Sequence, residues 1–493
     1  MAIDLRPLFK AYGVRGVVPD QLSLQVVQAL AAAFARVVVM PDAGVPAEPG
    51  RPGVVVGRDM RDSGPELVEA FARGLTSAGV DVTLIGLCST DGLYYASGQL
   101  DLPGAMFTAS HNPAQYNGIK LCRSGARSVG QETGLAEIRE LAQGYLDGAI
   151  PVPVRSAAET GEIINRDLLA DYAGFLRSLV DLSAARPLKV VVDAGNGMAG
   201  LTVPAVLGDA AGLAGLPLDL VPLYFELDGS FPNHEANPLD PANLIDLQAA
   251  VVANEADLGL AFDGDADRCF VVDERGGAVS PSAVTALVGL AEVTKELAAG
   301  RTPTVIHNLI TSRAVPDLLS SAGATTVRTR VGHSFIKAQM AEHGAVFGGE
   351  HSAHYYFRDF WFADTGMLAA LHVLAALSTQ GHTMSELAEM FEPYYGSGEI
   401  NSTVSDAAAA TDRVLDAYRA AYPGIVVDTL DGVTVSHWEA HPQWWFNLRA
   451  SNTEPLLRLN VEAADEDIME KVRDDVLSLV RETAGPAEEE EAL

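Results

Sequence analysis

LGLAFDGDADRCFVV, residues 258–272, places a turn with three aspartates between two short apolar runs. The runs 258–261 and 269–272 are too short for helices and are expected to form strands. Similar runs alternate with longer helical patterns along most of the chain, and this alternation predicts an α/β layered architecture. The other expected strands are 53–56, 81–85, 189–192 and 304–307, and the expected helices are 66–78, 132–145, 281–298 and 334–342.

The length of 493 residues exceeds what one hydrophobic core usually organises and predicts about three or four domains. The expected breaks are a Pro-punctuated connector at 150–154, a Gly-rich turn at 273–279 and a linker-like segment at 392–397. They divide the chain into units 1–154, 155–278, 279–394 and 395–493. In the last unit the strands 432–436, 444–449 and 456–461 precede one helix at 467–483, which predicts a small α+β domain with a solvated acidic tail.

The composition is that of a globular protein, with 48% apolar and 20% charged residues. Lys and Arg number 33 against 65 Asp and Glu, and the net charge of −32 argues against nucleic acid and membrane surfaces as partners. The first residues lack the apolar stretch of a secretory signal, and apolar segments such as 368–377 are too short to span a membrane, so a cytoplasmic protein is expected. Cys88, Cys122 and Cys269 are an odd number without zinc spacing, which indicates reduced thiols.

The turn 263–268 carries Asp263, Asp265 and Asp267 at alternate positions. Three carboxylates repel one another unless a cation lies among them, and hard oxygen ligands suit Mg²⁺ or Ca²⁺. An EF-hand is disfavoured because Arg268 stands where that loop needs Gly and because the flanking elements are strands. The alternative to a metal site is a solvated acidic turn.

Ser110 lies in TASHNP, residues 108–113, which is followed by YNGIK at 116–120. A serine flanked by His, Asn and a chain-breaking Pro is expected on a turn, where its hydroxyl can act as a nucleophile. The alternative is a turn whose side chains satisfy their own backbone. No G-x-S-x-G elbow surrounds Ser110, so a hydrolase triad is not indicated.

Two further loops combine polar groups suited to a sugar phosphate. GGEHSAH, residues 348–354, offers a carboxylate, a hydroxyl and two imidazoles for hydrogen bonding to sugar hydroxyls and for proton transfer. A polar turn without function is the alternative there. RASNTEP, residues 449–455, puts a guanidinium, two hydroxyls and an amide in one loop, a cradle for phosphate in an otherwise anionic protein.

GNGMAG, residues 195–200, follows an expected strand and matches the dinucleotide pattern G-x-G-x-x-G. Glu226 even ends a second strand about where a ribose-binding acid would lie. A tight turn between strand and helix, with no cofactor, explains the same residues.

Taken in order, these motifs resemble those of the α-D-phosphohexomutase family over nearly the whole chain. TASHNP is similar to the family's phosphoserine loop, DGDADR to its magnesium loop, GGEHSAH to its sugar-binding loop and RASNTEP to its phosphate-binding loop. FKAYGVRG, residues 9–16, looks like its N-terminal arginine segment. The resemblance implies four domains around a central cleft, namely three related α/β mixed-sheet domains and a C-terminal α+β domain.

The resemblance also implies a reaction, the interconversion of hexose 6-phosphate and hexose 1-phosphate. A phosphoserine at Ser110 would serve as donor and acceptor, Mg²⁺ as cofactor, and hexose 1,6-bisphosphate as intermediate and activator. The implied catalytic residues are Ser110, His111, Lys120, Arg268, His354 and Arg15; the metal ligands are Ser110, Asp263, Asp265 and Asp267; and the substrate-binding residues are Tyr12, His333, Glu350, Ser352, Arg449, Ser451, Asn452, Thr453 and Arg458.

The choice of sugar depends on one local segment. GGEHSAHYYFRDF, residues 348–360, looks most like bacterial phosphomannomutases, which favours mannose phosphates over glucose or glucosamine phosphates. Gly13 and Ile310 depart from the family pattern, which often has Asp and in some members Lys at these places. A nicotinamide-dependent dehydrogenase and a non-catalytic sugar-phosphate binding protein are the alternatives from other classes.

Overall fold

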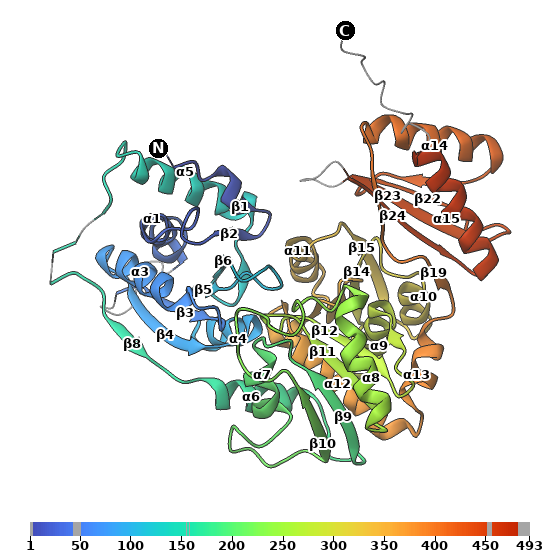
Figure 1. Cartoon of the computed structure of the whole chain (residues 1–493), viewed down its shortest axis with the longest axis horizontal. Coiled ribbons are helices and arrows are strands. Elements are labelled where there is room, and N and C mark those ends of the chain that lie inside the picture. Colours follow the sequence, from blue (N-terminus) through green and yellow to red (C-terminus); the bar gives the residue numbers. More distant parts are fainter. Residues whose placement is uncertain (1–2, 43–50, 154, 157, 451–455, 482–493) are drawn as a thin grey trace, which may run out of the picture.

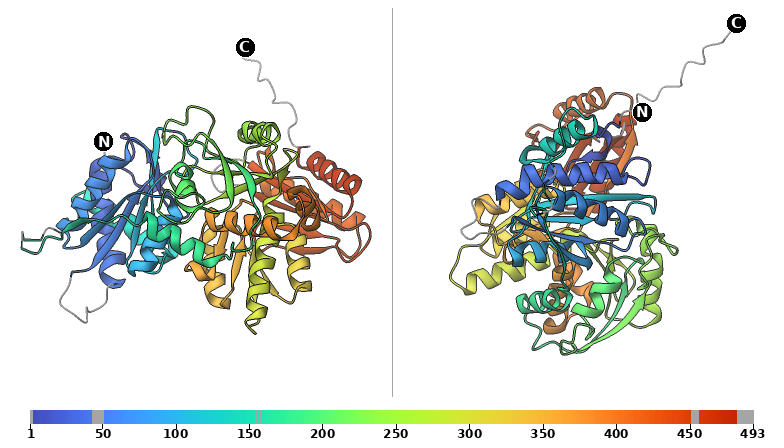
Figure 2. Two further views of the ribbon diagram at one scale, coloured as in Figure 1. Left: turned by 90° about the horizontal axis from the view of Figure 1, so that it is seen from below. Right: turned by 90° about the vertical axis from the view of Figure 1, so that its left-hand side faces the viewer.

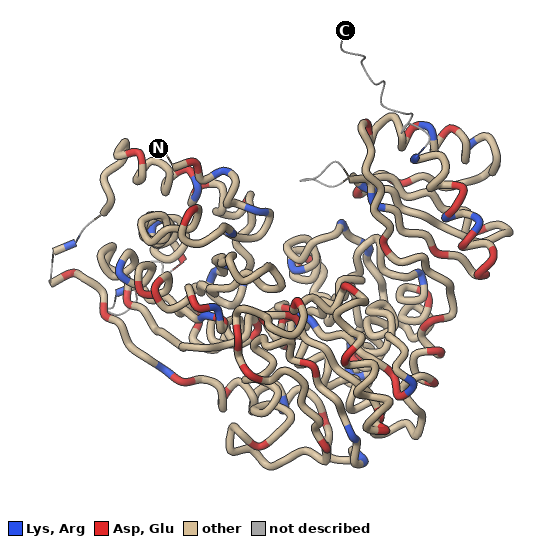
Figure 3. The backbone as a smooth tube through the Cα atoms, viewed as in Figure 1, with Lys and Arg blue, Asp and Glu red and all other residues tan. Residues whose placement is uncertain are grey.

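The computed structural model describes residues 3–42, 51–153, 155–156, 158–450 and 456–481. Its strands form four separate sheets that follow one another along the chain. Figures 1 and 2 show each sheet with its own covering helices, and Figure 3 shows acidic residues spread over all four parts. We refer to these parts as domains I to IV.

Domain I contains a mixed sheet of order β1-β2-β6-β5-β3-β4-β8, with β7 paired to β6. Its strands are β1 Phe9–Lys10, β2 Gly13–Val17, β3 Gly53–Arg58, β4 Asp81–Leu87, β5 Gly104–Phe107, β6 Tyr116–Arg123, β7 Arg127–Ser128 and β8 Ile163–Asn165. Its helices are α1 Leu24–Phe34, α2 Met40–Asp42, α3 Gly64–Ser77, α4 Thr90–Leu100 and α5 Leu135–Leu146. The helix expected at 132–145 therefore starts later, because Gly134 has a φ of 133° and separates α5 from a 3₁₀ turn at Gln131–Thr133.

One helix of domain I is more apolar than the sequence reasoning allowed for. The continuous helical segment Leu24–Asp42 is long and apolar enough to cross a membrane by length and composition. In the structure 61% of that apolar window is buried, and α1 packs against α3 and α5. Its apolar side chains thus belong to the core of domain I.

Domain II has the sheet order β10-β9-β11-β12-β13, and domain III has the order β15-β14-β16-β17-β18. The elements of domain II are α6 Leu169–Leu179, β9 Leu188–Asp193, α7 Ala199–Val206, β10 Leu218–Leu223, α8 Ile245–Ala253, β11 Leu258–Phe262, β12 Cys269–Asp273 and β13 Ala278–Val279. Those of domain III are α9 Pro281–Ala298, β14 Thr304–Asn308, α10 Ala314–Ser321, β15 Thr325–Thr329, α11 His333–His343, β16 Phe347–Gly349, β17 Tyr355–Phe357, β18 Ala363–Asp364, α12 Gly366–Gln380 and α13 Met384–Phe391.

The three α/β domains share one strand pattern, which confirms the expected relation between them. In each, one strand pairs in parallel with two neighbours, and the second of these neighbours pairs antiparallel with the strand that follows it. The last two strands of the pattern are β5 and β6 in domain I, β11 and β12 in domain II, and β16 and β17 in domain III. The loops 108–115, 263–268 and 350–354 therefore occupy equivalent places, and they contain three of the sequence motifs.

Domain IV is an antiparallel sheet with two helices, so the α+β expectation is confirmed. Its strands are β19 Tyr395–Gly396, β20 Ile400–Thr403, β21 Val426–Asp428, β22 Val433–Ser436, β23 Trp444–Ala450 and β24 Leu456–Ala463, and its helices are α14 Ala407–Ala421 and α15 Glu466–Arg481. The sequence reasoning expected only one helix here and missed α14. Domain IV has its own hydrophobic core, whereas one core runs from α4 through domains II and III.

The first domain extends beyond the break expected at residue 154. β8 follows that break and nevertheless pairs in parallel with β4. Its three residues are exposed, so the strand lacks the alternation of buried apolar and exposed polar residues by which a strand is recognised in a sequence. Cys88, Cys122 and Cys269 are all free thiols, as expected, and all three are buried.

Candidate active site

Ser110 lies at the contact between domains I and II. Its Oγ donates a hydrogen bond of 2.8 Å to Asp263 Oδ2 and lies 3.2 Å from His111 Nδ1. The residue is 6% exposed and has a φ of 49°, a left-handed conformation that is uncommon outside glycine. The serine motif of domain I and the aspartate motif of domain II thus meet side chain to side chain.

The three aspartates lie together with two cations. Lys120 Nζ donates to Asp265 Oδ2 and to Asp267 Oδ2, each at 2.6 Å, and Arg268 Nη2 lies 2.9 Å from Asp263 Oδ2. All three carboxylates are buried and offer ligand atoms within 4.8 Å of one another. Asp265 Oδ1 and Asp267 Oδ1 are buried without a hydrogen-bond partner, so two hard oxygen donors are available for a divalent cation such as Mg²⁺.

Burial and charge set the protonation of this cluster. Burial raises the pKa of Asp263 to about 7 against the attraction of Arg268. Burial also opposes ionisation of Asp265 and Lys120, but their mutual attraction prevails, lowering the pKa of the aspartate and raising that of the lysine. Burial and the nearby Arg268 lower the pKa of His111 to about 3, so its imidazole is neutral at pH 7.

Further site residues of domain I lie beside the serine loop or face domain III. The Arg15 guanidinium donates to the side chain of Asn112, within that loop. Burial lowers the pKa of Arg15. The ring of Tyr12 lies 4.0 Å from that of His333 in domain III, centroid to centroid. Burial lowers the pKa of His333 well below its usual value.

The domain III loop places its polar groups next to the aspartate cluster. His354 Nε2 lies 3.8 Å from Asp267 Oδ1, and its Nδ1 lies 2.9 Å from Ser352 Oγ. Glu350 is 2% exposed and accepts hydrogen bonds from Asn308, Gly332 and Tyr356. Its carboxylate is thereby fixed in orientation: Oε1 accepts two of these hydrogen bonds and Oε2 accepts one, which leaves a lone pair on Oε2.

Arg449 and Arg458 face each other on β23 and β24, where they are register partners. Both lie near Glu399, with shortest nitrogen–oxygen distances of 3.6 and 3.0 Å. The Nε of each is buried and has no hydrogen-bond partner among the described residues. Ser451, Asn452 and Thr453, also expected to bind phosphate, lie outside the described residues. Within the part of the chain that is described, no hydrogen bond or ion pair joins domain IV to domain I.

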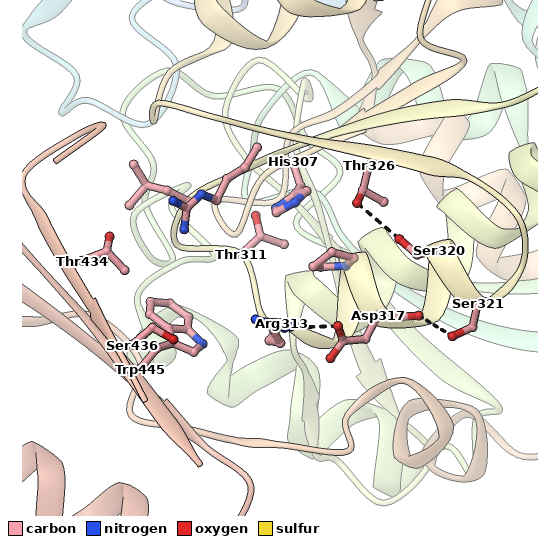
Figure 4. Close-up of a pocket in the computed structure, with 13 residues that line it drawn as sticks. His307, Thr311, Arg313, Asp317, Ser320, Ser321, Thr326, Thr434, Ser436 and Trp445 are labelled. Carbon is pink, nitrogen blue, oxygen red and sulfur yellow. Dashed lines mark hydrogen bonds and ion pairs between the residues drawn. The ribbon is translucent and has the colours of Figure 1, made fainter. Parts of the chain in front are cut away.

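A polar crevice of about 620 Å³ separates domains III and IV. Figure 4 shows Thr434, Ser436 and Trp445 of domain IV on one side and Arg313, Asp317 and Ser320 of domain III on the other. The predicted site residues are not among its lining residues. Across the boundary, Arg328 pairs with Asp428, and Glu462 accepts a hydrogen bond of 2.8 Å from the backbone N–H of Arg313.

The glycines of GNGMAG have a packing role in domain II. A Cβ at Gly197 would lie 2.7 Å from the carbonyl oxygen of Gly264, and one at Gly200 would lie 2.2 Å from that of Phe225. The turn 195–200 therefore lets the aspartate loop approach β9 and α7 closely. This accounts for the pattern without a dinucleotide.

Two buried residues around the site were missed by the sequence reasoning. Thr90 donates from Oγ1 to Asp265 Oδ2 at 2.6 Å, and Arg61 donates to the carbonyl of Ser110. A threonine and an arginine in polar segments carry no periodic signal that separates them from exposed neighbours. Only the contact between distant segments reveals them.

Comparisons with known proteins agree with this arrangement. Models of the phosphoglucomutase/phosphomannomutase family match all four domains: alpha/beta/alpha domain I at residues 6–146, domain II at 170–277, domain III at 281–394 and the C-terminal domain at 399–479. A phosphomannomutase of Escherichia coli is 37% identical over 477 residues, covering 96% of this chain and 99% of that protein. Phosphohexose mutases of Xanthomonas campestris are 38% identical over 479 residues, with the same coverage.

Solved structures show the same fold. A phosphoglucomutase/phosphomannomutase family protein from Burkholderia thailandensis superposes with a TM-score of 0.79 at 31% identity, covering 97% of this chain and 98% of that one. A putative phosphomannomutase from Thermus thermophilus gives a TM-score of 0.77 at 25% identity, covering 98% and 100%.

Three equivalent loops that bring a serine, three aspartates and the GGEHSAH motif together are those of a phosphohexomutase, an isomerase that moves a phosphoryl group within hexose phosphates. The chain belongs to the phosphoglucomutase/phosphomannomutase family. The dehydrogenase alternative is thereby excluded, since the G-x-G-x-x-G pattern lies within this family's second domain.

Proposed function

We propose that the protein interconverts mannose 6-phosphate and mannose 1-phosphate through a phosphoserine at Ser110. The observation that carries the proposal is the hydrogen bond of 2.8 Å from Ser110 Oγ to Asp263 Oδ2, which sets the hydroxyl at the edge of the buried aspartate cluster. The name phosphomannomutase of the Escherichia coli relative supports the choice of mannose. The broader name of the Xanthomonas relatives supports some use of glucose phosphates as well.

Each half-reaction exchanges one phosphorus–oxygen bond. The bond from phosphorus to Ser110 Oγ breaks, a bond to a sugar hydroxyl oxygen forms, the sugar hydroxyl gives its proton to a base, and Ser110 Oγ takes up a proton from an acid as it leaves. The product of this step is hexose 1,6-bisphosphate. This intermediate reverses its orientation in the site and returns its other phosphoryl group to Ser110. Lys120 pairs with Asp265 and Arg268 pairs with Asp263, so both positive charges lie beside Ser110 and can offset the negative charge on the transferred group. Arg15 and His111 border the same loop.

The divalent-cation site belongs to Asp263, Asp265 and Asp267, together with the Ser110 oxygen. Its buried, unpartnered carboxylate oxygens fit Mg²⁺. Mg²⁺, when bound, supplies positive charge that stabilises the transferring phosphoryl group. When all three aspartates are ionised, Lys120 and Arg268 leave one net negative charge among these five side chains, which favours cation binding.

Side chains of domain III bind the sugar. Glu350 and Ser352 are suited to the 3- and 4-hydroxyls, which nearly exchange places when the hexose turns over, and His354 serves as the general acid/base. The 2-hydroxyl that separates mannose from glucose has no equivalent after the turn, so it is read weakly. Tyr12 and His333, whose rings lie 4.0 Å apart, also belong to the proposed substrate site. The phosphate that does not react binds Arg449, Arg458 and the loop 451–453.

Two measurements test the proposal. Intact mass and ³¹P spectra of the purified protein should show one phosphate that Ser110→Ala lacks, and Ser110→Ala should be inactive; full activity of Ser110→Ala would refute the serine's role. The kcat/KM values for mannose, glucose and glucosamine 1-phosphates, with Mg²⁺ and a trace of hexose 1,6-bisphosphate, test the sugar. A preference for glucosamine 1-phosphate of about tenfold, or 1.4 kcal/mol, would change the substrate and leave the mechanism standing.

We further propose the partners, the location and the domain boundaries of the protein. Hexose phosphates are its partners, and a cytoplasmic location is supported by the three free, buried thiols. We also keep the boundaries 278/279 and 394/395, whereas β8 supports moving the first boundary beyond residue 165.

A further inference from the structure

Arg61 is buried beneath the serine loop, and its guanidinium is fully used. It follows β3, is 1% exposed, and its Nε donates to Asp59 Oδ2 at 3.2 Å. The two terminal nitrogens donate to four backbone carbonyls of the segment 110–116. Those acceptors are the oxygens of Ser110 at 2.8 Å, Asn112 at 2.6 Å, Pro113 at 2.9 Å and Tyr116 at 2.9 Å.

This convergence explains how the loop keeps an unfavourable shape. Four carbonyl oxygens directed at one point repel one another and, when buried, each needs a donor. A planar guanidinium with five N–H donors is the side chain that can serve them all. Ser110 is held at a φ of 49°, a strained conformation for a residue other than glycine that persists only where the surroundings impose it.

Arg61 also contacts the domain that carries the aspartates. Its Cζ lies 5.2 Å from the centroid of the Phe231 ring, which belongs to a loop of domain II. In the same loop, a Cβ at Gly229 would lie 2.8 Å from Arg61 Cα. One side chain therefore relates the backbone of the serine loop to the position of domain II.

We propose that Arg61 is a positioning residue for phosphoryl transfer: its guanidinium fixes the backbone of residues 110–116 so that Ser110 Oγ meets Asp263. The inference rests on the proposed phosphoserine chemistry. Arg61 acts through the main chain of the loop, because its donors are bonded to Asp59 and to these carbonyls. A residue that only stabilised the fold would affect unfolding and leave the rate of transfer unchanged.

Arg61→Lys is the direct test, since an ammonium keeps the charge but loses the planar fork. We expect kcat to fall by about tenfold or more, a loss confined to the transition state, with KM changed by less than about threefold. Single-turnover transfer from phosphorylated Ser110 to mannose 1-phosphate should slow by the same factor. Phe231→Leu, which removes the ring from the guanidinium and leaves its hydrogen bonds, should slow transfer in the same direction by a smaller factor.

Arg177 offers a matched control in domain II. Its guanidinium also donates to backbone carbonyls, those of Val206, Gly208 and Ala214, but away from the serine loop. Arg177→Lys should lower the unfolding midpoint and keep kcat within about twofold of the wild type. An equal loss of kcat in Arg177→Lys, or an unchanged transfer rate in folded Arg61→Lys, would overturn the role of Arg61.

The test separates this inference from the function on which it rests. If Ser110→Ala is fully active, the phosphoserine proposal fails and takes the inference with it. If Ser110→Ala is inactive while folded Arg61→Lys transfers phosphate at the wild-type rate, only the role of Arg61 fails. Should Arg61→Lys not fold, the transfer rate of Phe231→Leu decides, and a wild-type rate there would refute the inference.

Discussion

Gly264 and Ser110 touch across the boundary of domains I and II so closely that a Cβ at position 264 would lie 2.4 Å from the carbonyl oxygen of Ser110. That oxygen also accepts a hydrogen bond from Arg61, so the serine loop cannot retreat freely. The single glycine of DGDADR thus allows the aspartate loop to reach the serine.

Gly264→Ala should therefore separate the serine from Asp263. We expect kcat to fall by about tenfold or more, because a displacement of this size misaligns the transferring group. Steady-state kinetics at saturating Mg²⁺ measure the effect. Gly174→Ala is the control, since an added Cβ there meets nothing within 4 Å in helix α6. Equal kcat values for Gly264→Ala and the wild type would show that the contact is not needed.

Lys120 is expected to substitute in part for a metal ion. In Lys120→Gln, Asp265 and Asp267 lose their shared ammonium while remaining buried, which costs about 3 kcal/mol or more of unfolding free energy. Mg²⁺ should restore part of this loss, so the variant should gain more stability from Mg²⁺ than the wild type does. Urea unfolding with and without Mg²⁺ measures both quantities.

Arg51→Gln serves as the comparison for Lys120. That guanidinium is 35% exposed and pairs with Asp81 at 3.0 Å and with Glu162 at 3.1 Å, whose side chains are 41% and 74% exposed. Its loss should cost less than about 1 kcal/mol and leave the response to Mg²⁺ unchanged. The prediction would be contradicted if Mg²⁺ raised the unfolding free energy of Lys120→Gln by the same amount as that of the wild type.

The sequence made the local elements predictable and left their contacts open. The strand–turn–strand at 258–272 is visible because apolar runs flank an acidic turn, and it appears as β11 and β12. β8 was missed because its side chains are exposed, whereas α14 was missed although Asp406 caps it and its buried apolar residues recur at helical spacing. Arg61 and Thr90 depend on residues 49 and 175 positions away, a relation that only the folded chain creates.

Asp91 should make stability depend on pH. It is fully buried and accepts hydrogen bonds from Tyr172 of domain II at 2.7 Å and from Thr365 of domain III at 2.6 Å. Burial raises its pKa from 3.8 to about 6. Because the folded state holds the proton more tightly, this group stabilises the fold at low pH, and that stability is lost as the pH rises toward 6 and above.

Asp91→Asn removes this titration and keeps the shape. The difference in unfolding free energy between wild type and variant should change by about 1 kcal/mol between pH 5 and pH 7, with the wild type losing relative stability as the pH rises. Urea unfolding of both proteins at the two pH values gives the difference, in which other titrating groups cancel. A constant difference would show that Asp91 is ionised throughout.

Arg449 is expected to anchor the phosphate that does not react. Its side chain is 18% exposed, and among the described residues its guanidinium pairs with Glu399 at 3.6 Å while its Nε has no hydrogen-bond partner. Arg449→Ala should raise KM by more than about tenfold if the contact exceeds about 1.4 kcal/mol, with a smaller effect on kcat. Arg413→Ala, which removes a hydrogen bond to Leu479 within domain IV, should leave KM unchanged. An unchanged KM in Arg449→Ala would place the anchor elsewhere.

Domain IV should move toward domain I when hexose phosphate binds. In the proposed mechanism the substrate contacts Ser110 in domain I and the two arginines of domain IV at once, yet Figure 1 shows domain IV beside domain III, and no hydrogen bond or ion pair joins its described residues to domain I. Domain IV has a core of its own and adjoins the crevice at domain III, so it can rotate without disturbing the other cores. Small-angle X-ray scattering should show a smaller radius of gyration with saturating hexose 1,6-bisphosphate than without it. Arg449→Ala should weaken that decrease at subsaturating ligand, and Mg²⁺ alone should not cause it; a radius unaffected by ligand would mean that the substrate binds without domain closure.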